Sequence, residues 1–180
     1  MRILLMGFLF SLFSKSTDAQ PIPKSIYDFK VKALDESVIN FASFKGKKIL
    51  IVNTASKCGY TPQYKNLEAL HQRYKDQLVI VGFPANNFLW QEPGDNATIA
   101  EFCQKNYGVS FVMAAKISVK GNDMAPIYQW LTQKKYNQVE NSSVKWNFQK
   151  YLLDEKGNLI QMFSPGVDPL DAAIIQAIEK

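Results

Sequence analysis

One cysteine, Cys58, occupies the position in this sequence where a thiol could be most reactive. It lies between an apolar run that ends at Asn53 and a helical pattern that begins near Thr61. Free backbone N–H groups and the positive end of a helix dipole stabilise an anion before a helix, and Lys57 adds a neighbouring cation. Because the thiolate is the reactive form of cysteine, the sequence predicts nucleophilic or redox chemistry at Cys58.

The remaining cysteine and histidine content narrows that chemistry. The residue three positions after Cys58 is Thr61, so the motif lacks the Cys-x-x-Cys pair of dithiol exchange, which argues against a disulfide reductase. A lone thiolate suits attack on an electrophile such as a peroxide oxygen. Cys103 shares a predicted helix face with Ile99 and Phe102, which favours a buried core thiol. Two cysteines and one histidine fit no zinc pattern, and we expect no cofactor and no metal.

Uncharged N–H donors occur in two other segments that could reach the same place. Gln91 follows an apolar run at 78–83, and Trp146 and Asn147 precede a predicted hairpin. Such donors can stabilise a sulfur anion, or a peroxide oxygen as charge develops on it, without adding a titrating group. Taken alone, Trp146 would more often be an ordinary core residue.

The elements that would position these residues follow an α/β order. Two apolar runs joined by a helix, 49–53 and 78–83, predict a parallel βαβ unit with a right-handed crossover. Ligands gather at the carboxyl ends of such strands, and Cys58 directly follows the first. The other predicted elements are a hairpin at 29–41, helices at 61–74, 98–107 and 124–133, a second hairpin at 151–163, and a last helix from 168. This order predicts a thioredoxin-like fold, with a central mixed β-sheet flanked by helices and an N-terminal β-hairpin.

The first 20 residues form a separate segment. Arg2 precedes an apolar run from Ile3 to Phe13, and Thr17-Asp18-Ala19 offers a cleavage site. This layout is typical of a secretory signal peptide, although an uncleaved anchor or a tail is the alternative. We therefore expect export to a periplasm or outside the cell, with residues 21–180 as the mature domain.

The composition of the 180 residues is that of a globular protein, with 47% apolar and 21% charged residues. Removing Arg2, Lys15 and Asp18 with the leader lowers the formal net charge from +5 to +4. The charge is scattered without a basic block, which argues against nucleic-acid binding and would suit small anionic partners. No interior apolar run is long enough to span a bilayer, so no stable membrane insertion is expected once the leader is removed.

Three segments together resemble the glutathione peroxidase family. They are Asn-Thr-Ala-Ser-Lys-Cys-Gly-Tyr-Thr at 53–61, Gly-Phe-Pro followed by Gln-Glu-Pro-Gly within 82–94, and Trp-Asn-Phe at 146–148. The similarity runs from about Ser25 to the C-terminus, and the three motifs occur in the order and at the spacing of the family.

The resemblance implies an enzyme that reduces hydrogen peroxide and organic hydroperoxides as part of the response to oxidative stress. It implies that Cys58 is the peroxidatic residue, in a form with cysteine rather than selenocysteine, and that Gln91, Trp146 and Asn147 complete a catalytic tetrad. The Cys58 sulfenic acid would be reduced by glutathione or thioredoxin. Lys57 is a candidate for holding the thiolate or an anionic reductant.

The sequence also departs from the family pattern. Ala85 replaces a cysteine that many members have, and Leu89-Trp90 replaces the usual Gly-rich pair before the glutamine. Cys103 is the candidate resolving thiol, but it falls one residue before the expected position, a rotation of about 100° on a helix. The segment between Lys134 and Val144 is short, which favours a monomer. A peroxide sensor with weak turnover is the alternative function.

Overall fold

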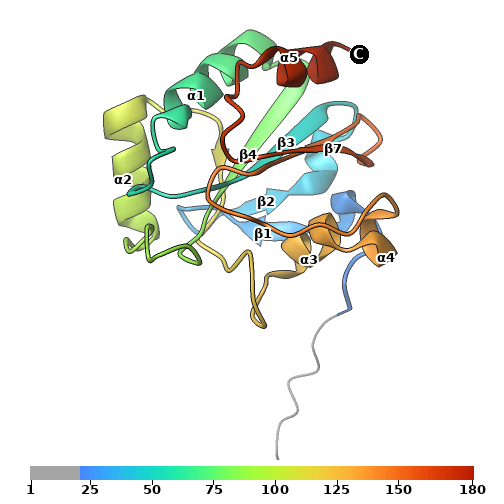
Figure 1. Cartoon of the computed structure of the whole chain (residues 1–180), viewed down its shortest axis with the longest axis horizontal. Coiled ribbons are helices and arrows are strands. Elements are labelled where there is room, and N and C mark those ends of the chain that lie inside the picture. Colours follow the sequence, from blue (N-terminus) through green and yellow to red (C-terminus); the bar gives the residue numbers. More distant parts are fainter. Residues whose placement is uncertain (1–20) are drawn as a thin grey trace, which may run out of the picture.

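The computed structural model describes residues 21–180, so the predicted leader lies outside the described residues. Its centre is a five-stranded mixed sheet in the order β5-β4-β3-β6-β7 (Figure 1). β3 pairs in parallel with β4 and β4 with β5, whereas β6 is antiparallel to both β3 and β7. The strands are β3 (Lys48–Thr54), β4 (Leu78–Pro84), β5 (Val112–Met113), β6 (Lys150–Leu153) and β7 (Leu159–Phe163).

The burial of β3 explains the apolar run at 49–52 within it. All seven residues of β3 are buried. Ile49 and Ile51 point into one core cluster, whereas Leu50 and Val52 point into the other, as the alternation of a strand requires. β3 is therefore covered on both faces, and its carboxyl end is held in place by both layers.

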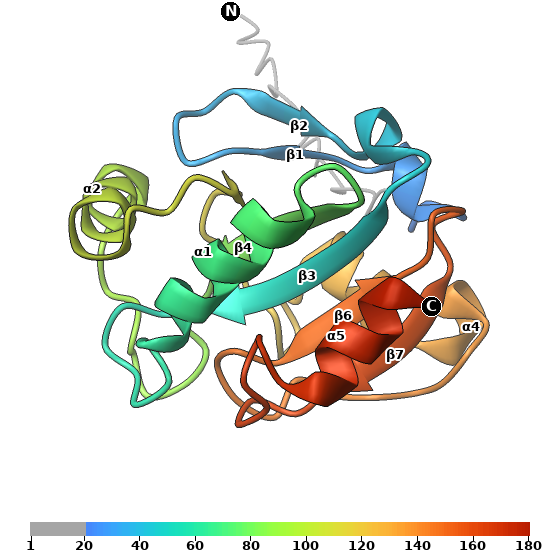
Figure 2. The same cartoon turned by 90° about the horizontal axis from the view of Figure 1, so that it is seen from above.

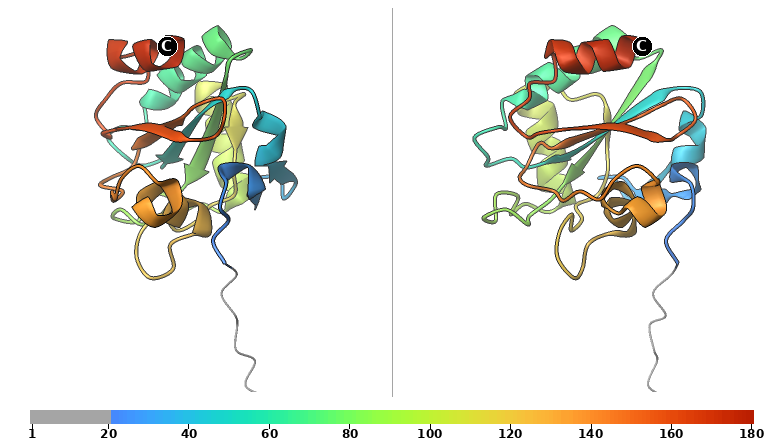
Figure 3. Two further views of the ribbon diagram at one scale, coloured as in Figure 1. Left: turned by 90° about the vertical axis from the view of Figure 1, so that its right-hand side faces the viewer. Right: turned by 45° about the vertical axis from the view of Figure 1, so that its right-hand side comes forward.

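Different elements cover the two faces of the sheet (Figures 2 and 3). One face carries α1 (Gln63–Tyr74), α2 (Asn96–Tyr107) and α5 (Ala172–Glu179). The other carries α3 (Pro126–Thr132), α4 (Lys134–Asn137) and a separate hairpin of β1 (Lys30–Lys32) and β2 (Val38–Asn40). Two short 3-10 turns, Ile26–Asp28 and Phe41–Phe44, flank the hairpin.

The structure confirms the predicted architecture, with the N-terminal hairpin, the parallel βαβ unit, the mixed sheet and the β6–β7 hairpin in place. The turn of that hairpin contains Gly157 at φ +81°, a conformation that glycine adopts without steric cost. The sequence did not predict β5 or α4. Both are short, and β5 forms only because it pairs with the edge of β4.

All four predicted helix starts are displaced, and the helices begin at Gln63, Asn96, Pro126 and Ala172. α5 begins at Ala172, because the Asp171 carboxylate accepts the Ala173 N–H at 2.8 Å and caps the helix there, whereas Asp168 accepts the Leu170 N–H in the preceding turn. α1 begins at Gln63, and Thr61 does not cap it. Within residues 21–180, no helix has the length and apolar character needed to cross a membrane.

Candidate active site

The loop after β3 holds Cys58 by hydrogen bonds of its own. The Tyr60 N–H donates to the Cys58 Sγ at 3.4 Å, while the Cys58 N–H donates to the Thr61 Oγ1 at 2.9 Å. The Thr61 hydroxyl in turn donates to the Ala55 carbonyl at 2.9 Å. Thr61 therefore stabilises the cysteine loop. The sulfur accepts its hydrogen bond from the Tyr60 amide in this loop rather than from the first turn of α1.

Gln91 is joined to the cysteine loop through the backbone. The Lys57 N–H donates to the Gln91 carbonyl at 3.0 Å, one residue before Cys58. The Gln91 side chain reaches the third segment, because its Oε1 accepts a hydrogen bond from the Asn147 Nδ2 at 2.9 Å. The structure thus links the segments of Cys58, Gln91 and Asn147, which the sequence predicted to lie at one edge of the sheet.

Trp146 and its neighbours are fixed to the end of β3. The Asn53 Nδ2 donates to the Trp146 carbonyl at 3.1 Å, and the Phe148 N–H donates to the Asn53 carbonyl at 2.6 Å. Phe148 is fully buried at φ +67°, a left-handed conformation that is costly for a bulky residue and is found at functional sites. The half-buried Trp146 ring packs on Phe88, with ring centroids 5.4 Å apart, and contacts the core cluster that includes Cys58.

The hydrogen bond that Asn147 makes differs from the expectation that Gln91, Trp146 and Asn147 each donate toward the sulfur of Cys58. Asn147 is fully buried, and the hydrogen bond recorded for its Nδ2 goes to Gln91. Its Oδ1 has no partner among the described residues. Because the Gln91 Oε1 is occupied as an acceptor, the Gln91 Nε2 is the end of that amide able to donate toward a substrate.

Glu92 is a site residue that sequence reasoning missed. Its carboxylate is fully buried and accepts the Ser56 hydroxyl through Oε1 at 2.5 Å, while Oε2 has no partner among residues 21–180. Burial raises the pKa of the Glu92 carboxyl, although the Ser56 hydrogen bond opposes this. In the sequence, Gln-Glu-Pro-Gly reads as an ordinary turn, so only the fold shows that Glu92 ties the cysteine loop to the loop of Gln91.

Lys57 remains the cation closest in sequence to the thiol. Its side chain is exposed and forms no salt bridge within the described chain. It lines a mostly apolar pocket of about 340 Å³ together with Ser56, Glu92 and Phe102. This pocket lies between the cysteine loop and α2, with Lys57 among its lining residues.

Cys103 lies inside α2 and is only 3% exposed. Burial raises the pKa of its thiol to about 11, and the nearby Tyr64 hydroxyl opposes this in part. Cys58 and Cys103 are both free thiols and belong to the same buried cluster. In this conformation Cys103 is therefore a neutral core thiol. Ala85 is also fully buried.

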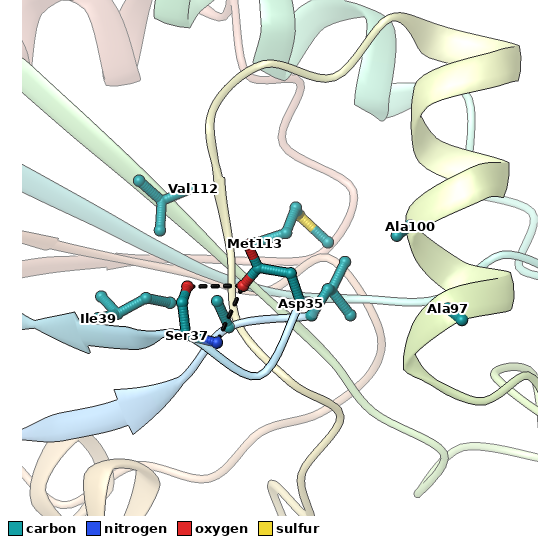
Figure 4. Close-up of a pocket in the computed structure, with 9 residues that line it drawn as sticks. Asp35, Ser37, Ile39, Ala97, Ala100, Val112 and Met113 are labelled. Carbon is teal, nitrogen blue, oxygen red and sulfur yellow. Dashed lines mark hydrogen bonds between the residues drawn. The ribbon is translucent and has the colours of Figure 1, made fainter.

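A further hollow lies away from these residues (Figure 4). It has a volume of about 670 Å³ and is bounded by the β1–β2 turn, β5 and α2. Asp35 and Ser37 bond to one another at its edge, and Ala97 and Ala100 face it from α2. None of the predicted site residues lines it, so the size of a hollow does not locate the chemistry here.

The comparisons with known proteins agree with this geometry. The sequence profile of the family described as glutathione peroxidase matches residues 26–132. A glutathione peroxidase-like peroxiredoxin of Schizosaccharomyces pombe is 51% identical over 139 residues, covering 77% of this chain and 87% of the relative. A glutathione peroxidase of Lactococcus lactis is 45% identical over 146 residues, covering 81% and 92%.

Solved structures give the same assignment. The apo form of a protein named Trgpx superposes with a TM-score of 0.65 at 36% identity, covering 87% of this chain and 96% of the other. The fold is therefore the thioredoxin-like fold of these proteins, as the sequence predicted. The motifs, the profile and the relatives together show that this chain belongs to the glutathione peroxidase family.

Proposed function

We propose that the chain is a thiol-dependent peroxidase that reduces hydrogen peroxide and organic hydroperoxides at Cys58. The observation that carries this proposal is the hydrogen-bonded connection from the cysteine loop through Gln91 to Asn147. It joins an oriented amide to the loop that carries a thiol that is 7% exposed. Family membership supports the same activity, because relatives are named glutathione peroxidases and glutathione peroxidase-like peroxiredoxins.

The reaction begins with the Cys58 thiolate. Its sulfur attacks one peroxide oxygen of ROOH, so that an S–O bond forms while the O–O bond breaks. Cys58 loses two electrons and becomes a sulfenic acid, and the leaving RO⁻ takes up a proton to give ROH. The Gln91 Nε2 and the indole N–H of Trp146 would stabilise the charge that develops on oxygen, with Asn147 orienting Gln91.

An external thiol then restores the enzyme. The first thiol R′SH condenses with the Cys58 sulfenic acid and releases water, and a second R′SH breaks the mixed disulfide to give R′SSR′ and free Cys58. Glutathione and thioredoxin are the candidate reductants, and Lys57 is the residue that would attract an anionic one. The burial of Cys103 favours such an external thiol, since a buried thiol with a raised pKa is a poor nucleophile.

Replacing Cys58 by Ser tests the proposal directly. The Cys58→Ser variant should consume no hydrogen peroxide with either reductant, whereas the matched Cys103→Ser variant should still form a sulfenic acid after one equivalent of peroxide. Retention of peroxide turnover in the Cys58→Ser variant would sink the proposal.

Mass spectrometry of the oxidised chain separates the routes of reduction. A Cys58–Cys103 disulfide after one equivalent of peroxide would establish Cys103 as the resolving thiol. A persistent sulfenic acid that glutathione or thioredoxin reduces would point to an external thiol. A single oxidation without turnover by either reductant would favour the alternative function, a peroxide sensor. The reason for considering this alternative is that Ala85 replaces a cysteine of the family pattern.

We also propose that the chain is exported and acts as a monomer. The layout of residues 1–20 supports export, and the short segment around α4 supports the monomer. The intact mass of the protein from its native cell and its mass in solution by light scattering test the two statements. A retained leader or a stable tetramer would contradict them.

A further inference from the structure

A fully buried lysine, Lys150, is the first residue of β6, three positions after Asn147. It pairs with Val52 of β3 and with Phe163 of β7, so both of its strand neighbours are apolar. Burial of an ammonium group is costly unless its hydrogen bonds are satisfied. A lysine at this place in the core therefore calls for an explanation from its contacts.

Three acceptors satisfy the Lys150 ammonium, and none of them is a carboxylate. Its Nζ donates to the Gln63 Oε1 at 2.6 Å, to the Pro165 carbonyl at 3.1 Å and to the Val167 carbonyl at 2.5 Å. These contacts use all three of its N–H donors. Burial lowers the pKa of Lys150 to about 8, and the charge of Asp168 opposes this. At neutral pH the side chain is therefore mostly protonated, with all three donors present.

These bonds join the segment after β7 to the start of α1. Gln63 is the first residue of α1, and its Nε2 donates to the same Pro165 carbonyl at 2.9 Å. One turn further along α1, the Asn66 Nδ2 donates to both carboxylate oxygens of Asp168, at 3.0 and 2.8 Å. Residues 165–168 are therefore fixed between β6 and the helix that follows the cysteine loop.

The fixed segment in turn contacts Tyr60, which belongs to the cysteine loop. Gly166 lies against the Tyr60 side chain, since a Cβ at Gly166 would be 3.3 Å from the Tyr60 hydroxyl oxygen. The Tyr60 N–H is the donor to the Cys58 Sγ. A chain of contacts thus runs from Lys150 through the segment of Gly166 and the Tyr60 ring to the reactive sulfur.

We propose that Lys150 is a positioning residue for the peroxidatic thiol, which acts through Gly166 and Tyr60 to hold the Tyr60 N–H on the Cys58 sulfur. A hydrogen bond from an amide stabilises the charged form of sulfur, which is the form that attacks peroxide. A lysine suits this role because its three donors bind two carbonyls and a side chain at once. The inference rests on the peroxidase function proposed above and adds a residue to its site.

A second buried lysine separates positioning of the thiol from structural support alone. Lys48 is 7% exposed, and its Nζ donates to the Ile178 carbonyl at 2.8 Å and lies 3.3 Å from the Glu155 carboxylate. It is the first residue of β3, at the opposite end of that strand from the cysteine loop. Lys48→Met therefore removes a buried ammonium while it leaves the contacts of the cysteine loop in place, and it is the matched control.

Stopped-flow oxidation of Cys58 by hydrogen peroxide tests the proposal. Lys150→Met should slow this step by roughly tenfold, as expected for loss of a hydrogen bond to a charged group. It should also lower the ultraviolet absorbance of the thiolate at neutral pH, to which the neutral Cys103 does not contribute. Reduction of the sulfenic acid by glutathione should change less, because the attacking sulfur then belongs to the reductant. Lys48→Met should be oxidised as fast as the parent even where its Tm falls.

A double variant tests the role of Tyr60 in this chain of contacts. Tyr60→Ala keeps the backbone N–H but removes the ring that lies against Gly166, so it should slow oxidation to a similar extent. Lys150→Met/Tyr60→Ala should be hardly slower than either single variant, because both changes break the same chain of contacts. If Lys150→Met does not fold, Gln63→Ala takes its place, since it removes one acceptor of Lys150 and the second donor to Pro165.

Three results would overturn the proposal. One is oxidation of Lys150→Met at the rate of the parent. Another is an equal slowing in Lys150→Met and Lys48→Met, which would make Lys150 a structural residue only. The third is multiplication of the two effects in the double variant. Each of these results leaves the peroxidase function intact, whereas a parent chain that consumes no peroxide would contradict that function itself.

Discussion

The Asn147 Nδ2 donates a hydrogen bond to the Gln91 Oε1 at 2.9 Å, and this contact gives the two amides different roles. Gln91 is held with its oxygen toward the buried Asn147, which leaves its NH₂ group as the donor for substrate. Asn147 acts through Gln91 by fixing the orientation of that amide. The pair therefore works as one unit, in which each substitution removes part of the same interaction.

This relationship predicts strongly non-additive kinetics. Gln91→Ala and Asn147→Ala should each slow oxidation of Cys58 by peroxide, by roughly tenfold or more, while the reductive step changes less. The Gln91→Ala/Asn147→Ala variant should be hardly slower than Gln91→Ala alone, because Asn147 has nothing left to orient. Stopped-flow fluorescence during oxidation measures these rates. Effects that multiply in the double variant would contradict the positioning role of Asn147.

The buried carboxyl of Glu92 predicts a specific pH dependence of stability. Its folded-state pKa is raised by burial, so the unfolded chain loses this proton first as the pH rises above the ordinary glutamate range. The parent should therefore lose stability on going from the ordinary pKa of glutamate up through the raised one. Glu92→Gln keeps an acceptor for Ser56 but cannot ionise. Its stability should consequently rise relative to the parent as the pH increases through this range, and its Tm should exceed that of the parent at the upper end.

Thermal unfolding of both proteins across this pH range measures the effect. An unchanged difference between them at every pH would show that Glu92 does not titrate differently in the folded chain. The Glu92→Leu variant is a second comparison, because it removes the Ser56 contact as well and should be less stable than Glu92→Gln at all pH values.

Cys103 predicts a loss of stability at alkaline pH. Its pKa of about 11 in the folded chain exceeds the ordinary value of 9.0, so the unfolded thiol ionises first as the pH rises from about 9 to 11. The reduced parent should lose up to about 2 kcal/mol relative to Cys103→Ala across this window. Urea unfolding of the two proteins under reducing conditions measures the difference, and a flat difference would mean that the thiol is more accessible than the structure shows.

The local elements followed from sequence pattern because their causes are local or nearly so. The apolar run of β3, the helical spacing of α1 and the Gly turn at Gly157 each predict an element directly. The short elements β5 and α4 were not predicted from the sequence. They have only two and four residues, and they form through contacts with neighbouring elements. The starts of α1 and α5 shifted for a related reason, because Thr61 and Asp168 have other hydrogen-bond partners in the fold.

The sequence by itself determined the chemistry of the site, because the identities and spacings of the Cys58 thiol and of the three N–H donors are properties of the chain. Tertiary structure decided which atoms face each other. Residues 56 positions apart, Gln91 and Asn147, share a hydrogen bond only because β6 lies antiparallel to β3 and returns the chain to the same edge of the sheet. Burial likewise decided that Glu92 has a raised pKa and that Cys103 is a neutral core thiol. Desolvation depends on everything packed around a group, and no local pattern in the sequence carries that information.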